Sequence, residues 1–119
     1  MEKPGKFTTL AVLTLLSGVS NIIGGLFLTA MVVIGTLGIG LLCAPITLLP
    51  TVLGVFELIY AVKMLSEPPR ITQPAPVIAS LEIACLLYGN IIAAAAGIVA
   101  LVMYNDEEVK TYLASLSPN

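Results

Sequence analysis

The sequence predicts an all-α integral membrane protein with three long transmembrane helices, the second kinked by prolines, and a short C-terminal amphipathic helix. Apolar residues make up 58% and charged residues 10% of the 119 residues, against roughly 45–50% and 25% in soluble domains. No residue from Phe7 to Phe56 is charged, and a second long apolar stretch runs from Val77 to Tyr104. The mean hydropathy of +1.05 indicates that lipid, not water, surrounds most of the chain.

The first span is expected over residues 8–33. This stretch exceeds the roughly 20 apolar residues that cross a hydrocarbon core. Lys3 and Lys6 precede it, as basic residues precede the apolar part of a signal peptide. The apolar run is much longer than the roughly 7–15 residues of such a segment, and no typical cleavage site closes it. We therefore expect the first span to be retained.

The second span is expected over residues 40–65, after a glycine-rich turn. It contains Pro45 and Pro50, and each proline removes a backbone donor and clashes with the preceding helical turn. We expect the first half of this span to be kinked or partly unwound, and regular helix to follow from Pro50.

The third span is expected over residues 77–104, after a proline-rich loop. The tail, residues 105–119, opens with an acidic cluster that suits a helix N-terminus. Its apolar residues recur at i, i+3, i+4 and i+7, which predicts a short amphipathic helix lying on the bilayer. Residues 1–119 are expected to form one domain.

Basic residues set the expected orientation. With three spans, Lys3, Lys6, Lys63 and Arg70 fall on one side, which the positive-inside rule assigns to the cytoplasm. The N-terminus would lie inside and the C-terminus outside, in the cell (inner) membrane. Four spans are the alternative, in which residues 35–49 cross alone and Lys63 and Arg70 lie outside.

Glu57 and Glu82 are the acids embedded in apolar sequence. A charge at the bilayer centre costs at least about 2.5–3.5 kcal/mol, so such acids usually face protein or water. Counted from the loop between spans two and three, both would lie at similar depth on antiparallel helices. They predict either a proton or cation site, or neutral groups that hydrogen-bond or pair with Lys63. The candidate polar site comprises Glu57, Glu82, Asn21, Asn90, Tyr60 and Tyr88.

Small residues recur at intervals of four on the first and third spans. Such spacing places them on one helix face, where another helix can approach closely. They predict packing within the chain or between chains, with pore lining as the alternative. The expected packing positions are Ser17, Gly18, Gly24, Gly25, Gly54, Gly89, Ala93 and Gly97.

Several chemistries are not expected. The chain has no histidine, the commonest metal ligand and the usual proton shuttle near neutral pH. Cys43 and Cys85 are isolated thiols, expected at different depths as apolar fillers. No nucleophile–base pair or phosphate-binding loop is present, and the net charge of −2 does not favour nucleic acid. We expect no enzyme activity, no cofactor and no metal.

The sequence therefore favours a small non-enzymatic subunit that acts through helix packing. Its partners would be the lipid bilayer and either further copies of itself or other membrane-protein subunits. The alternative is a homo-oligomeric ion or proton channel or carrier that uses Glu57 and Glu82. A third possibility is lipid or quinone binding beside the kinked second span.

Overall fold

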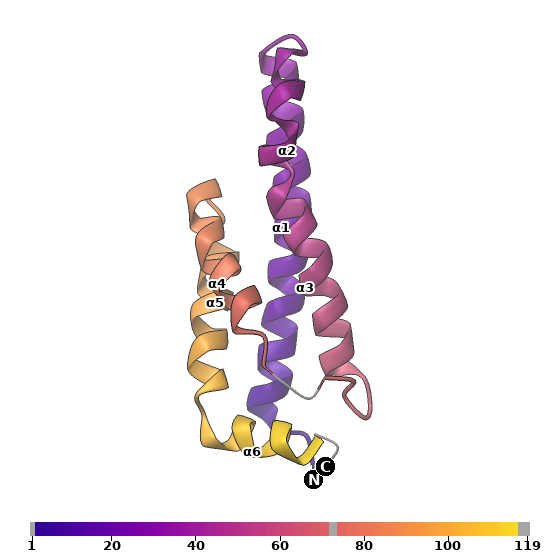
Figure 1. Ribbon diagram of the computed structural model, residues 1–119, viewed down its shortest axis with the longest axis vertical. Helices are drawn as coiled ribbons and strands as arrows, with labels where there is room; N and C mark the ends of the chain where they lie inside the picture. The colour runs from indigo at the N-terminus through magenta and orange to yellow at the C-terminus, as the bar shows by residue number, and fades with distance from the viewer. Residues whose placement is uncertain (1, 72–73, 117–119) are drawn as a thin grey trace.

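The computed structural model describes residues 2–71 and 74–116, and every regular element within those ranges is a helix. The molecule is elongated, measuring 55 × 21 × 20 Å along its principal axes. Figure 1 shows two long antiparallel arms, a shorter helical hairpin beside them, and a last helix across their base.

Helix α1, Gly5–Gly35, forms the first arm. Its side chains are mostly apolar, and hydroxyl groups within it bond back to the carbonyl four residues earlier, as Thr14 does to Leu10 at 2.9 Å. This leaves few polar groups without partners along the helix. The arm ends where the chain reverses after Thr36, through Leu37 and Gly38 with positive φ angles.

The second arm descends in three consecutive helices rather than one. They are η1, Ile39–Cys43, α2, Ala44–Thr47, and α3, Leu49–Leu65. Pro45 and Pro50 lie in the first turns of α2 and α3, each as the second residue of its helix, where a proline removes no intrahelical hydrogen bond. The upper half of this arm is therefore irregular and its lower half is regular helix. Among the described residues, two segments are long and apolar enough to cross a membrane, namely α1 and residues 39–65.

The third apolar segment does not form the single helix expected over residues 77–104. Helix α4, Pro76–Ala84, continues as η2, Cys85–Tyr88, and the chain then turns back into α5, Ile91–Tyr104. Gly89 adopts φ +77°, which only glycine adopts without strain. The Asn90 side chain accepts a hydrogen bond from Ala93 N at 3.0 Å and so caps α5.

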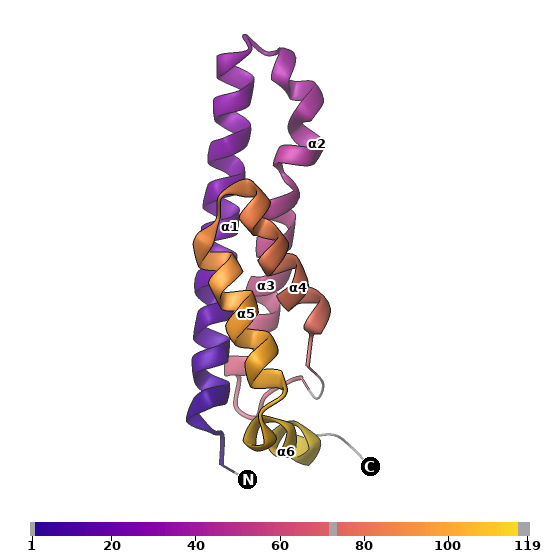
Figure 2. The ribbon, with the colours of Figure 1, turned by 90° about the vertical axis from the view of Figure 1, so that its left-hand side faces the viewer.

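The hairpin α4–α5 ends part-way along the two arms. In Figure 2 the far part of α1 and the turn into η1 rise beyond its tip. At 14 residues, α5 is about 21 Å long, which is less than the roughly 30 Å of a hydrocarbon core. The chain from α4 to α5 therefore rises from the base of the molecule and returns to the base.

Helix α6, Glu107–Leu116, closes the base of the molecule. Val109, Tyr112 and Leu113 are buried in the main apolar cluster together with Phe7 and residues of the two arms. The rings of Phe7 and Tyr112 meet edge to face, with centroids 5.0 Å apart. The tail is thus an amphipathic helix, but its apolar face packs on protein instead of lying on a bilayer.

This base brings the two ends of the described chain together. Lys6 at the start of α1 pairs with Asp106 just before α6, at 2.8 Å. An odd number of crossings would place these residues on opposite sides of a membrane. The expectation of a C-terminus outside and an N-terminus inside is therefore incompatible with this fold. The alternative with residues 35–49 as a separate span also differs from it, because those residues continue into α3.

Candidate functional site

Glu57 lies at the centre of a polar network inside the three packed segments. It projects from α3 and is fully buried. Ser17 Oγ donates to its Oε1, and Asn21 Nδ2 donates to its Oε2 at 2.7 Å. Ser17 and Asn21 are four residues apart and so share one face of α1. Each oxygen of Glu57 therefore has its own donor from the first arm.

Asn90 extends this network to the tip of the hairpin. Its Nδ2 donates to Asn21 Oδ1 at 2.7 Å and to Ser20 Oγ at 3.1 Å. The residue that caps α5 is thus also the link between the hairpin and α1. Both links in the direction of Glu57 run the same way, from Asn90 to Asn21 and from Asn21 to Glu57. Glu57 is the final acceptor of the chain.

Glu82 approaches Glu57 from α4. Its side chain is 1% exposed, and neither carboxyl oxygen has a hydrogen-bond partner among the described residues. The Glu82 carboxyl lies close enough to that of Glu57 for the two to interact directly. A buried carboxylate without a partner is costly, so this residue requires a physical account.

Glycines set the close spacing that buries these carboxyls. A Cβ on Gly97 would lie 2.9 Å from the Glu82 Cβ, and it would also meet the Ala79 carbonyl. A Cβ on Gly18 would lie 2.9 Å from the Gly54 carbonyl. Because neither site has room for a side chain, the α4–α5 and α1–α3 pairs cross at near backbone contact.

The structure places the other small residues in different surroundings. Gly25 contacts Thr51 across the arms, and Ala93 is buried inside the hairpin. Gly24 is exposed, with nothing within 4 Å of an added Cβ. Gly89 lies in the hairpin turn and is not a packing position. Ser17 both packs and donates to Glu57, a polar role that its position one turn before Asn21 indicates.

The two candidate tyrosines lie away from the carboxyl pair. Tyr88 sits at the hairpin tip and donates to the Ile46 carbonyl at 3.1 Å. Tyr60 lies nearer the base, where its hydroxyl accepts from Tyr104 at 3.5 Å. Of the six candidates, the structure brings together Glu57, Glu82, Asn21 and Asn90. Cys85 lies close enough to interact with both carboxyls, while Cys43 is exposed on the second arm.

Several openings adjoin this network, and a small one of about 40 Å³ is lined by both Asn21 and Asn90. A cavity of about 400 Å³ beside the hairpin tip is lined by Ser20, Ile23, Gly24, Tyr88, Gly89 and Asn90. An apolar groove of about 360 Å³ lies between α3 and the α4–η2 part of the hairpin, and Pro50, Phe56 and Cys85 are among its lining residues. The groove holds almost no polar atoms, so all of the polar lining lies on the Asn90 side.

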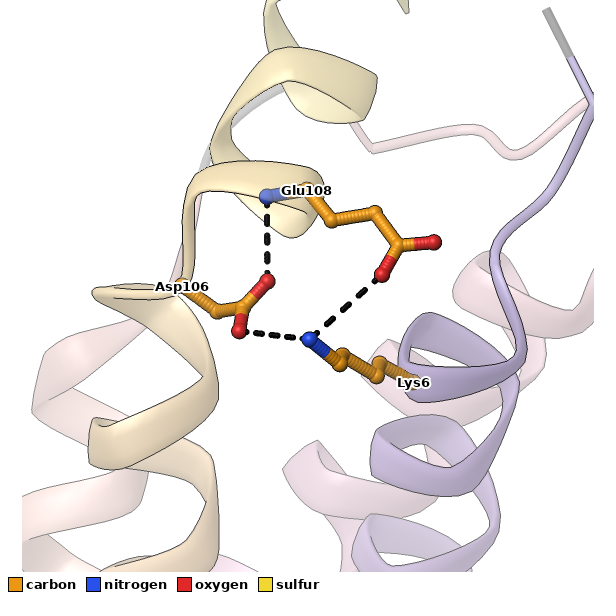
Figure 3. Close-up of polar contacts among 3 residues, drawn as sticks. All are labelled: Lys6, Asp106 and Glu108. Carbon is orange, nitrogen blue, oxygen red and sulfur yellow. Dashed lines mark hydrogen bonds and ion pairs between the residues drawn. The ribbon is translucent and has the colours of Figure 1, made fainter.

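The base carries a separate group of charges (Figure 3). Lys6 Nζ lies 2.8 Å from Asp106 Oδ2 and 3.5 Å from Glu108 Oε2. Asp106 Oδ1 also accepts from Glu108 N at 3.0 Å, which caps α6. The hydrogen bond from Lys6 holds the pKa of the Asp106 carboxyl below its ordinary value. These contacts fasten α6 to the start of α1.

Among the described residues, no group of three or more Cys, Asp or Glu side chains is arranged to hold a metal ion. Comparison of the chain with protein-family models, with curated proteins and with solved structures finds no match. The functional reading therefore rests on the geometry described above.

Proposed function

We propose that this chain is a small non-enzymatic membrane protein that acts as a structural or accessory subunit, packed into an oligomer or a larger membrane complex. One observation carries the proposal: the hairpin α4–α5 stops part-way along the arms (Figure 2), and large apolar side chains at its tip and at the far turn, such as Leu87 and Leu37, are exposed.

The distribution of surface groups favours a bilayer. Large apolar side chains are exposed along both arms and along α5. Soluble proteins rarely expose so much contiguous apolar surface. Apart from Glu57 and Glu82, every charged side chain belongs to the base, near the start of α1, the end of α3 and α6. A chain with a single charged end and apolar flanks suits insertion from one side.

The length of the first arm favours a protein partner beyond the lipid. At 31 residues, α1 is about 46 Å long. Even at a tilt of about 40°, the upper end of the usual range, it would extend about 35 Å along the membrane normal. A hydrocarbon core of roughly 30 Å does not cover its far end. That end is apolar and open, with Leu37 95% exposed.

The hairpin tip gives a second reason for a partner. Irregular backbone at membrane depth is tolerated where protein or a water-filled cavity covers it. The turn at Gly89 lies inside the expected hydrocarbon depth, and the neighbouring Leu87 is 90% exposed. A second copy or another subunit seated against this tip would cover the turn.

The mass of the particle purified in a mild detergent tests the proposal. We expect protein mass above the 12.4 kDa of one chain, from further copies or from other polypeptides. A particle that holds one chain and no other protein would contradict it. To identify a second copy, Leu87→Cys is introduced into a C43S/C85A background and oxidised in the membrane. Val62→Cys, also exposed but near the base, is the control and should give less cross-linked dimer.

A second candidate is ion or proton transfer by an oligomer through Glu57 and Glu82. The observation that favours it is the continuous polar chain from the cavity beside Ser20 and Asn90 to the Glu57 carboxyl. Reconstituted vesicles test it. Proton or cation flux that both Glu57→Gln and Glu82→Gln abolish would favour transfer, and vesicles without flux would exclude it.

A further inference from the structure

The two buried carboxyls differ in what surrounds them. Glu57 receives a hydrogen-bond donor on each oxygen, from Ser17 and Asn21. Hydrogen bonds of this kind stabilise the ionised form of a carboxyl. Glu82 receives none from the described residues, although it is equally buried. The donors therefore favour a negative charge on Glu57 and leave Glu82 without support for one.

The groups around Glu82 offer no positive charge to offset a second negative one. The ionisable side chains that interact with it are Glu57 from α3, Cys85 from η2 and Tyr104 from α5. The groups that α1 contributes to the site, Ser17 and Asn21, are uncharged and donate to Glu57. Within the part of the chain that the structure describes, no lysine or arginine is paired with either carboxyl.

We propose that Glu57 and Glu82 form a buried proton-binding site, in which Glu82 carries one proton and donates it to the ionised Glu57. Two ionised carboxyls have only acceptors to offer one another, and this is why Glu82 lacks a partner. A single proton converts the contact into a charge-assisted O–H···O⁻ hydrogen bond. It gives one of the two unpartnered Glu82 oxygens a hydrogen bond and removes one of two adjacent buried charges.

The site adds a second link between the arms and the hairpin, beside the hydrogen bonds from Asn90 to Asn21 and Ser20. Glu57 belongs to the arms, and Glu82 belongs to the hairpin. Loss of the proton would set two negative charges against each other in a site shielded from water, where repulsion is strong. The proton therefore holds the α4–α5 hairpin against α1 and α3. This role differs from the subunit packing proposed above and requires no passage of protons across a membrane.

Infrared spectroscopy of the full chain tests the proposal. The protein is reconstituted into vesicles of an ether-linked phosphatidylcholine, because ester carbonyls would overlap the absorption of a protonated carboxyl. We expect a protonated-carboxyl band at neutral pH in the wild type and its loss in Glu82→Gln. Glu57→Gln should retain the band at a shifted position, since the proton stays on Glu82 but its acceptor becomes an amide. Glu67→Gln, in the exposed loop, is the control and should leave the band unchanged.

A second measurement reports the docking of the hairpin. In a C43S background, Cys85 is the remaining thiol and is buried beside the carboxyls. Its labelling by a membrane-permeable thiol reagent should rise with pH in the wild-type pair and be several-fold slower at alkaline pH in Glu82→Gln. Absence of the infrared band in the neutral wild type, or an identical band in Glu82→Gln, would overturn the proposal. Equal labelling of Cys85 in both proteins at alkaline pH would also contradict it.

Discussion

At the scale of single residues, the polar side chains of the core derive their roles from their order along one hydrogen-bonded chain. Asn21 is the central member, because it donates to Glu57 and accepts from Asn90. Replacing it affects two partners on two different elements. Ser20 makes related contacts but lies near the cavity, where water can take its place.

Asn21→Ala is expected to destabilise the fold more than Ser20→Ala. Removing the buried amide leaves a donor on Asn90 and an acceptor on Glu57 unsatisfied, and each unsatisfied group costs about 1–3 kcal/mol. The free energy of unfolding in detergent micelles, measured by chemical denaturation, tests this. Equal losses for the two variants would show that the amide is not the link between the hairpin and the arms.

Gly97→Ala and Gly24→Ala form a matched pair. The methyl group at Gly97 would meet backbone and Cβ atoms of α4, and overpacking of this kind costs about 1–3 kcal/mol. The methyl group at Gly24 would meet nothing within 4 Å, so it should leave stability unchanged or raise it by up to about 1 kcal/mol through helix propensity. Thermal denaturation of both variants in one detergent compares them. A larger loss at Gly24 than at Gly97 would contradict the close crossing of α4 and α5.

At the scale of elements, sequence patterns predict that the third apolar segment is helical but do not predict the turn within it. Its apolar character from residue 77 to residue 104 was evident, and hydropathy averaged over a window does not register a single turn. Gly89, Ala93 and Gly97 recur at intervals of four, which favoured one continuous helix. The turn depends on the positive φ of Gly89 and the cap by Asn90, and a glycine followed by asparagine inside an apolar run is compatible with either outcome.

Part of the predicted site is nonetheless independent of that turn. The similar depth of Glu57 and Glu82 was counted from the loop that joins their helices, and α4 leaves this loop as the expected third span would. The structure places the two carboxyls close enough to interact. The roles of Ser20 and of the unpartnered Glu82 oxygens were not predictable, because they depend on which faces of α1 and α4 meet.

The ion pair between Lys6 and Asp106 is expected to be lost at low pH, while the apolar face of α6 stays packed in the core cluster. The hydrogen bond from Lys6 lowers the pKa of Asp106 below its ordinary value of 3.8. A group whose pKa is lowered by folding stabilises the folded state above its ordinary pKa, and this stabilisation is lost as the pH falls through the lowered value. The carboxyl resonance of Asp106, followed by NMR, should titrate below 3.8 and move up toward it in Lys6→Met. An unchanged titration in that variant would show that the ion pair does not form in solution.

At the scale of the whole molecule, the base gathers both ends of the described chain. Cysteines introduced at Lys3 and at Glu107, in a C43S/C85A background, are expected to react with an impermeant reagent from the same face of an oriented membrane. A continuous third span would expose them on opposite faces. Thr36→Cys at the far turn is the control and should label from the other side. Labelling of positions 3 and 107 from opposite faces would refute the hairpin.

The uncharged far turn has a consequence for how the chain enters a bilayer. From Phe7 to Phe56 there is no ionised side chain, so threading the two arms through lipid moves no charge from one aqueous compartment to the other. The α4–α5 hairpin would insert only its tip and would leave no loop on the opposite side of the membrane. A protonated Glu82 would enter the lipid as a neutral group. In the membrane arrangement proposed above, biogenesis would require partitioning into lipid but no translocation of a hydrophilic segment.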